Sequence, residues 1–172
     1  PLVRLLLRFG LDVTACDKTP RAALDDEVLE LERMGAKLRL GDDYLADLAG
    51  DVVFRTPGML PTRPELQALI RQGAEPTSEM EAFFELCPCM LIAVTGSDGK
   101  TTTTTLIAEM LKAAGRRVFL GGNIGTPLLP QADEMQPDDI AVVELSSFQL
   151  MDMRRSPHIA AITNLAPNHL DY

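Results

Sequence analysis

The stretch TGSDGKTT, residues 95–102, constrains the fold of this chain more than any other segment. An apolar run of strand length, residues 90–94, precedes it, and apolar residues spaced three and four apart, as on one helix face, follow it. A strand, a glycine turn and a helix form the context of a phosphate-binding loop, because unpaired N–H groups and aligned peptide dipoles at a helix N-terminus favour an anion. We therefore predict that this stretch binds the phosphates of a nucleotide. The expected buried helix face consists of Leu106, Ile107, Met110, Leu111 and Ala114.

The residue types within the loop suit this chemistry. Glycines permit close backbone approach and positive φ angles. Lys100 can reach the outer phosphates, and the Thr101 hydroxyl can ligate Mg²⁺. The usual template, G-x-x-x-x-G-K-[ST], would place its first glycine at Val94, so an ordinary turn with a capping threonine is the alternative. The predicted nucleotide-binding residues are Gly96, Ser97, Asp98, Gly99, Lys100, Thr101 and Thr102.

Composition argues against several classes of protein. With 46 % hydrophobic and 24 % charged residues, the chain can bury a core. A net charge of −9 argues against nucleic acid as a partner. Three cysteines are too few and too odd for a disulfide framework, so reduced thiols are expected. No apolar run approaches the roughly 20 residues that cross a bilayer. We expect a soluble cytoplasmic protein with no membrane partner.

Short strands alternate with helices along the chain, which predicts an α/β fold with parallel sheets. We expect a Rossmann-like domain over residues 1–88 and part of a P-loop ATPase domain over residues 89–172. Both are expected to be incomplete, since the chain starts on a helix where a first strand would precede it and stops in a polar loop directly after a strand. The expected helices cover residues 2–9, 24–34, 64–72 and 79–86, and the expected strands cover residues 13–16, 37–40, 51–54, 118–120, 139–143 and 159–163.

Polar residues follow several of the expected strands. Ligands of open α/β sheets collect at the carboxyl ends of the strands, where Lys100, Asn123, Glu144 and His169 would lie. Glu144 is a natural second ligand for Mg²⁺, which prefers hard oxygens, although it could instead cap a helix or pair with a lysine. His169 by its position alone is more often a surface or core histidine.

Four segments together resemble the Mur ligases of peptidoglycan synthesis: residues 95–102, 121–125 (GGNIG), 144–150 (ELSSFQL) and 164–171. The resemblance covers essentially the whole chain. It implies an ATP-dependent amide ligase that adds D-glutamate to UDP-N-acetylmuramoyl-L-alanine through an acyl phosphate, uses ATP and Mg²⁺, and is a monomer at full length. The alternatives are another amino-acid ligase of this family and a nucleotide-binding module without catalysis.

The resemblance also implies roles for individual residues. Lys100, Glu144 and His169 would be catalytic, and Mg²⁺ would be held by Thr101, Glu144 and His169. Asp17 lies at a strand end where related folds bind a ribose, and it is among the expected substrate contacts. These are Asp17, Lys18, Thr56, Gly58, Asn123, Ser146 and Gln149.

Overall fold

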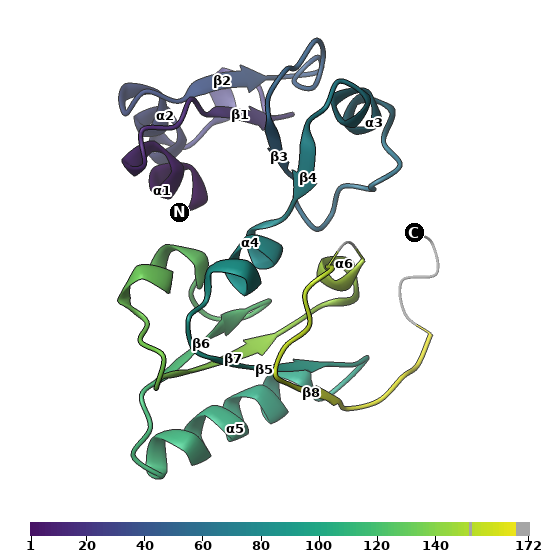
Figure 1. Ribbon diagram of the computed structural model, residues 1–172. Helices are drawn as coiled ribbons and strands as arrows, with labels where there is room; N and C mark the ends of the chain where they lie inside the picture. Colours follow the sequence, from purple (N-terminus) through teal and green to yellow (C-terminus); the bar gives the residue numbers. More distant parts are fainter. Residues whose placement is uncertain (152, 168–172) are drawn as a thin grey trace. The chain divides into compact units, whose positions relative to one another are not determined.

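The computed structural model describes residues 1–151 and 153–167 (Figure 1). By packing, the chain divides into two compact units, which we call the first and second units. The first contains Pro1–Val53 and Pro61–Glu75, and the second contains Phe54–Leu60 and Pro76–Tyr172. This grouping differs from the expected boundary at residues 88 and 89, since residues 54–60 and 76–88 pack with the second unit. The α/β class with parallel sheets is confirmed.

In the first unit, β1 and β2 pair in parallel from Thr14 opposite Lys37 to Asp17 opposite Leu40. Leu24 lies before α2 and ends a short 3₁₀ turn, so the helix starts later than its apolar spacing suggests. The elements are α1 (Leu2–Arg8), β1 (Thr14–Asp17), η1 (Arg21–Ala23), α2 (Asp26–Arg33), β2 (Lys37–Leu40) and α3 (Pro64–Arg71). Two further strands, β3 (Val52–Phe54) and β4 (Glu75–Thr77), form a separate two-stranded sheet, and each has residues assigned to both units.

The second unit is built on a four-stranded sheet with the order β6-β7-β5-β8, in which every neighbouring pair is parallel. The two inner strands are apolar runs, as expected for strands buried on both faces. Figure 1 shows α5 running along one face of this sheet. The elements are α4 (Glu79–Leu86), β5 (Met90–Thr95), α5 (Lys100–Ala113), β6 (Val118–Gly122), η2 (Leu129–Glu134), β7 (Ile140–Glu144), α6 (Ser147–Leu150) and β8 (Ile159–Ile162).

The buried face of α5 differs from the predicted one. Leu106 and Met110 are 58 % and 64 % exposed, whereas Thr104 and Ala108 are fully buried. Small residues four positions apart allow the helix to approach the sheet closely. The Thr104 hydroxyl donates to the Lys100 carbonyl at 2.7 Å, so its burial leaves no polar group unpaired. Only one edge of the apolar stripe, Ile107 with Leu111, packs against the core.

The strand β6 is longer than predicted. Gly121 and Gly122, expected in a turn, are strand residues that pair with Val143 and Glu144. A Cβ atom on Gly122 would lie 2.2 Å from the Glu144 carbonyl oxygen, so only glycine allows this close approach. The sequence reading also missed β4, η2 and α6, which are too short to show a hydrophobic period. Among the described residues, no helix is long and apolar enough to span a membrane.

Candidate functional site

The glycine loop joins the carboxyl end of β5 to the first turn of α5. Gly96 has φ 139°, and a Cβ atom there would lie 2.1 Å from the Thr163 hydroxyl oxygen. Gly99 is the N-cap of α5 with φ 76°, and no side chain caps this helix. The first N–H groups of a helix have no partner within it. The first turn of α5 therefore offers main-chain donors, and the positive end of a 14-residue helix, to a ligand at this edge of the sheet.

The chain after β8 holds the loop in place. Asn164 accepts two main-chain hydrogen bonds from the loop: from Asp98 N at 2.8 Å through its side-chain oxygen, and from Ser97 N at 3.2 Å through its carbonyl. The Thr163 hydroxyl donates to the Asp98 carbonyl at 2.6 Å, and the Ser97 hydroxyl donates to the Ala166 carbonyl at 2.9 Å. Sequence reasoning gave Thr163 and Asn164 no role of their own, because nothing local marks a contact to a loop 65 or 66 residues away.

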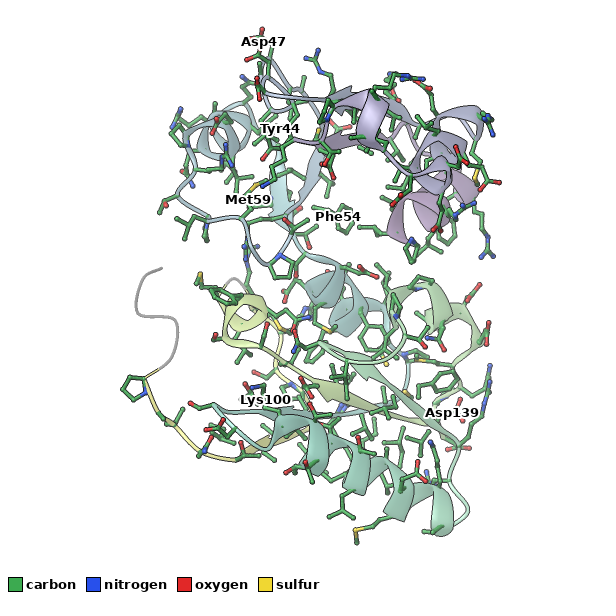
Figure 2. All side chains as sticks on the ribbon, turned by 180° about the vertical axis from the view of Figure 1, so that it is seen from behind. Tyr44, Asp47, Phe54, Met59, Lys100 and Asp139 are labelled. Atoms are coloured by element: carbon green, nitrogen blue, oxygen red, sulfur yellow. The ribbon has the colours of Figure 1, made fainter. Side chains whose placement is uncertain are left out.

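Lys100 crosses its own loop. Its ammonium donates to the Gly96 carbonyl at 2.8 Å and to the Ser97 carbonyl at 3.0 Å. Figure 2 places Lys100 at the start of α5. The charge is therefore held over the glycine turn, next to the first turn of α5.

Glu144 contacts two other predicted site residues. Its carboxylate is 1 % exposed, and it accepts from the Thr101 hydroxyl at 2.8 Å and from the Asn123 side-chain amide at 2.9 Å. The Asn123 main-chain N–H donates to the Glu144 carbonyl at 2.8 Å. Because a buried carboxylate needs hydrogen-bond donors, these contacts fix its orientation. Glu144 does not cap the next helix, since Ser146 occupies the N-cap of α6.

The Thr101 hydroxyl and the Glu144 carboxylate fit a magnesium ion. Both are hard oxygen donors, and they lie 2.8 Å apart. Adjacent ligands of an octahedral Mg²⁺ lie about 2.9 Å apart, since each bond is about 2.1 Å long. His169, the third expected ligand, lies outside the described residues. Within those residues, no three His, Cys, Asp or Glu side chains cluster as a metal site.

Ser146 and Gln149 bind each other. Gln149 accepts from Ser146 N at 2.9 Å and its own N–H donates to the Ser146 hydroxyl at 3.3 Å, which is a capping box at the start of α6. These hydrogen bonds fix the polar atoms of both side chains shortly after the end of β7. Thr56 and Gly58 lie in an exposed turn of the same unit.

Asp17 and Lys18 lie in the first unit, at the end of β1. The Asp17 carboxylate accepts from Thr19 N at 2.8 Å, and this hydrogen bond lowers the pKa of Asp17. Asp17 therefore forms the turn that its residue type favours. Its expected contact with a nucleotide stays a prediction.

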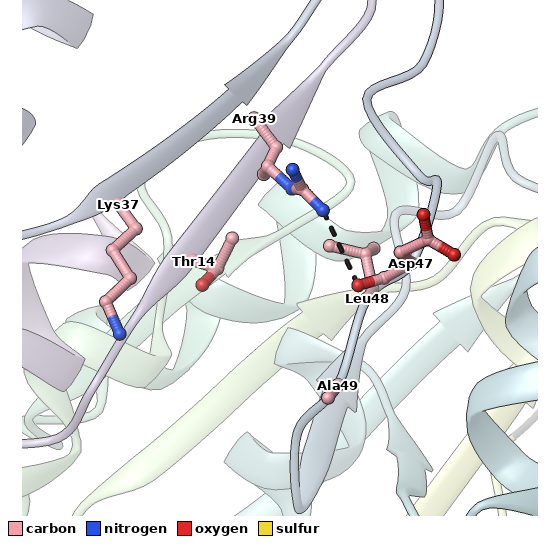
Figure 3. A pocket seen from close by; sticks show the side chains of 6 residues that line it. All are labelled: Thr14, Lys37, Arg39, Asp47, Leu48 and Ala49. Carbon is pink, nitrogen blue, oxygen red and sulfur yellow. Dashed lines mark hydrogen bonds between the residues drawn. The ribbon is translucent and has the colours of Figure 1, made fainter.

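A cavity of about 310 Å³ in the first unit contains none of the expected site residues. Arg39 is one of its lining residues (Figure 3). Its guanidinium donates to the carbonyls of Ala46 at 2.8 Å and Asp47 at 3.5 Å. Lys37 pairs with Asp12 at 2.6 Å. The two cationic side chains that line the cavity are thus already paired with protein groups. The lining residues are Thr14, Lys37, Arg39, Asp47, Leu48 and Ala49.

One protein family matches the second half of the chain, and individual relatives match its whole length. Residues 94–172 match the Mur ligase middle domain. The chain is 54 % identical over 172 residues to UDP-N-acetylmuramoylalanine--D-glutamate ligase of Ruminiclostridium cellulolyticum, and 53 % identical to the enzyme of that name from Acetivibrio thermocellus. Each alignment covers 99 % of this chain and 37 % of the relative. The chain thus spans little more than a third of these relatives.

A solved structure shares the fold. The crystal structure of UDP-N-acetylmuramate:L-alanyl-gamma-D-glutamyl-meso-diaminopimelate ligase from Neisseria meningitides superposes with a TM-score of 0.54 at 21 % identity. The superposition covers 98 % of this chain and 57 % of that one. Since the middle-domain match contains the glycine loop, Glu144 and the chain after β8, and the identity to the relatives extends over both units, the chain belongs to the Mur ligase family.

Proposed function

We propose that the chain is the part of an ATP-dependent amide ligase that binds the nucleotide and the muramoyl substrate, and that the complete protein joins D-glutamate to UDP-N-acetylmuramoyl-L-alanine. The observation that carries this proposal is the buried Glu144 carboxylate, bonded to Thr101 and Asn123 at the mouth of the glycine loop. The names of the relatives support the choice of substrates. The activity is proposed for a protein of their length, which contains this chain.

The loop and the start of α5 would hold the ATP phosphates. The uncapped N–H groups of the first turn donate to phosphate oxygens, and the helix dipole adds to the attraction. Lys100 would exchange the Gly96 and Ser97 carbonyls for the outer phosphates, which carry full negative charge. Gly96, Ser97, Asp98 and Gly99 supply the turn, and Thr102 is the next residue of the helix.

Thr101 and Glu144 would hold one Mg²⁺, and His169 is proposed as a ligand for a second. When bound, the metal neutralises phosphate charge and so makes the γ-phosphorus a better electrophile. The protein itself supplies the hydroxyl and carboxylate oxygens that fit the ion. Asn123 holds the Glu144 carboxylate in the orientation that presents its second oxygen to Thr101.

The reaction proceeds in two displacements. The L-alanyl carboxylate attacks the γ-phosphorus of ATP, which releases ADP and leaves an acyl phosphate. The D-glutamate amine then attacks the acyl carbon, phosphate departs, the nitrogen loses a proton, and an amide bond remains. The protein contributes positioning and charge stabilisation more than covalent chemistry. Asn123, Ser146 and Gln149 would orient the muramoyl-alanine arm, and the uridine nucleotide would be bound by Asp17, Lys18, Thr56 and Gly58.

Phosphate release tests the proposal in the complete protein. Release should require ATP, UDP-N-acetylmuramoyl-L-alanine and D-glutamate together. Lys100→Ala should lower turnover about 10²-fold or more, because it removes a preorganised charge from the transferring phosphate. Lys112→Ala is the matched control, since Lys112 lies on the same helix and pairs with Glu109 at the surface.

Two results would overturn the proposal. Turnover of Lys100→Ala equal to that of Lys112→Ala would remove the phosphate role. A panel of amino acids decides the substrate: preference for an acceptor other than D-glutamate would assign the chain to a different ligase of the family, and no turnover with any acceptor would indicate a nucleotide-binding module.

A further inference from the structure

Arg55 is a buried cation that the proposed mechanism does not use. It follows β3 in the second unit and is only 5 % exposed. Its main-chain N–H donates to the Thr77 carbonyl at 2.9 Å, which fixes its backbone beside β4. A buried charge is costly unless it is hydrogen-bonded, so its partners show what it organises.

The guanidinium gathers the turn that follows it. One terminal nitrogen of Arg55 donates to the carbonyls of Thr56 at 3.1 Å and Pro57 at 3.2 Å, and it also donates to the Met59 carbonyl. The turn closes on itself through Met59 N, which donates to the Thr56 carbonyl at 3.0 Å. Since Thr56 and Gly58 are proposed substrate contacts, Arg55 sets the conformation of a substrate-binding turn.

The other terminal nitrogen reaches a second proposed substrate segment. It lies 3.5 Å from the Phe148 carbonyl in α6, 93 residues further along the chain. Phe148 stands between Ser146 and Gln149, the two members of the capping box. Both partners belong to the second unit. A planar guanidinium with donors in a rigid fork can bridge two carbonyl groups that a lysine ammonium would contact one at a time.

We propose that Arg55 is a positioning residue that holds the turn of residues 56–59 and the start of α6 in one arrangement, so that both segments meet the same muramoyl substrate. The identity of that substrate rests on the proposed function. Arg55 touches no reacting atom in this account. It acts through Thr56 and Gly58 on one side and through Ser146 and Gln149 on the other.

Steady-state kinetics of the complete protein test the effect on substrate binding. Arg55→Met keeps the length of the side chain and removes its donors, and Arg55→Lys keeps one charged group. Arg155→Ala is the control, because Arg155 is 57 % exposed and pairs with Glu85 in the same unit. We expect Arg55→Met to raise KM for UDP-N-acetylmuramoyl-L-alanine about tenfold, as the loss of one or two hydrogen bonds does, and to leave KM for ATP within about twofold. Arg55→Lys should fall between Arg55→Met and the native protein.

Amide hydrogen exchange of the same proteins tests the tether without a substrate. Met59 N and Leu150 N donate within the two tethered segments, to Thr56 and Ser146 respectively. Arg55→Met should speed exchange at both amides by about tenfold, and it should leave the amides in the middle of α5 unchanged. Arg155→Ala should change neither. A melting temperature of Arg55→Met equal to that of the native protein would show that the fold is retained.

The two measurements separate the possible failures. Exchange that rises at Met59 and not at Leu150 would overturn the bridge between the segments. If exchange rises at both amides but KM for UDP-N-acetylmuramoyl-L-alanine and KM for ATP change equally, the role of Arg55 in muramoyl binding is overturned. If the native protein does not turn over D-glutamate at all, the proposed function fails, and with it the identity of the substrate, whereas the exchange data still decide whether Arg55 joins the segments.

Discussion

Glu144 shows at the scale of one residue how burial and hydrogen bonding define a site. The carboxylate could not stay buried without donors, and Thr101 and Asn123 provide one for each oxygen. The sequence placed all three at strand or helix ends, since each follows an apolar run or the glycine turn. Their mutual contacts are tertiary, because the Thr101 and Glu144 positions are 43 residues apart.

Removing the Thr101 hydroxyl should destabilise the protein. Thr101→Val keeps the shape of the side chain and leaves one Glu144 oxygen without its donor, which costs about 1–3 kcal/mol. Thr101→Ser should retain most of the stability because it keeps the hydroxyl. Chemical denaturation of the three proteins measures the difference. Equal stability of the valine and serine variants would contradict the role of this bond.

Cys89 should be the slowest of the three thiols to react. Burial, first of all, and the nearby Cys87 thiol raise the pKa of Cys89 to about 12, so the reactive thiolate is scarce at pH 8. Its labelling by iodoacetamide should therefore rise steeply between pH 8 and pH 10, as read from peptide masses. Cys16, whose side chain is partly exposed, is the internal reference. Labelling of Cys89 at pH 8 as fast as that of Cys16 would contradict this.

At the scale of elements, the strands with long apolar runs were predictable and the tight contacts between elements were not. β5 and β7 are continuous apolar runs that end in the loop and in Glu144, so their existence and direction follow from local pattern. The buried face of α5 was predicted wrongly, since size rather than hydrophobicity decides which residues can approach the sheet. Gly121 and Gly122 were expected in a turn, although they are strand residues, and Gly122 lies so close to Val143 and Glu144 that a larger residue would not fit.

Replacing Gly96 tests the contact between the loop and the end of β8. Gly96→Ala adds a Cβ atom 2.1 Å from the Thr163 hydroxyl oxygen, in a backbone conformation that alanine disfavours. Gly115→Ala is the matched control, because Gly115 also has positive φ, 80°, with nothing near its Cβ position. We expect Gly96→Ala to lose about 1–3 kcal/mol more unfolding free energy than the control, measured by denaturation. Equal losses of unfolding free energy in Gly96→Ala and Gly115→Ala would show that the contact between the loop and Thr163 does not contribute to stability.

At the scale of the molecule, the proposed substrate contacts divide between the two units. Asp17 and Lys18 belong to the first, and Thr56, Gly58 and the residues near α6 belong to the second. The sequence reading placed Thr56 and Gly58 in the earlier domain because they precede residue 88 in the chain. Chain order cannot reveal that residues 54–60 group with the chain after residue 75 in one compact unit.

The 172-residue chain by itself should not ligate D-glutamate. It spans 37 % of the length of its curated relatives, so the complete set of substrate contacts is not expected within it. The purified chain should give no phosphate release that depends on D-glutamate, whereas the complete protein should give it under the same conditions. Ligation by the chain alone, detected by mass spectrometry of the product, would contradict this expectation.

The α/β class, the glycine loop with Lys100 and the strand-end position of Glu144 follow from the order of the residues alone. These depend on residues within about 20 positions of one another, where hydrophobic period and turn chemistry are visible. The folded chain was needed to show that Asn164 and Thr163 hold the loop, that Thr101 and Asn123 meet at one carboxylate, and that Arg55 reaches α6. Such contacts form when distant segments are buried together, and a hydrogen bond across 43 or 93 residues leaves no periodic mark in the chain.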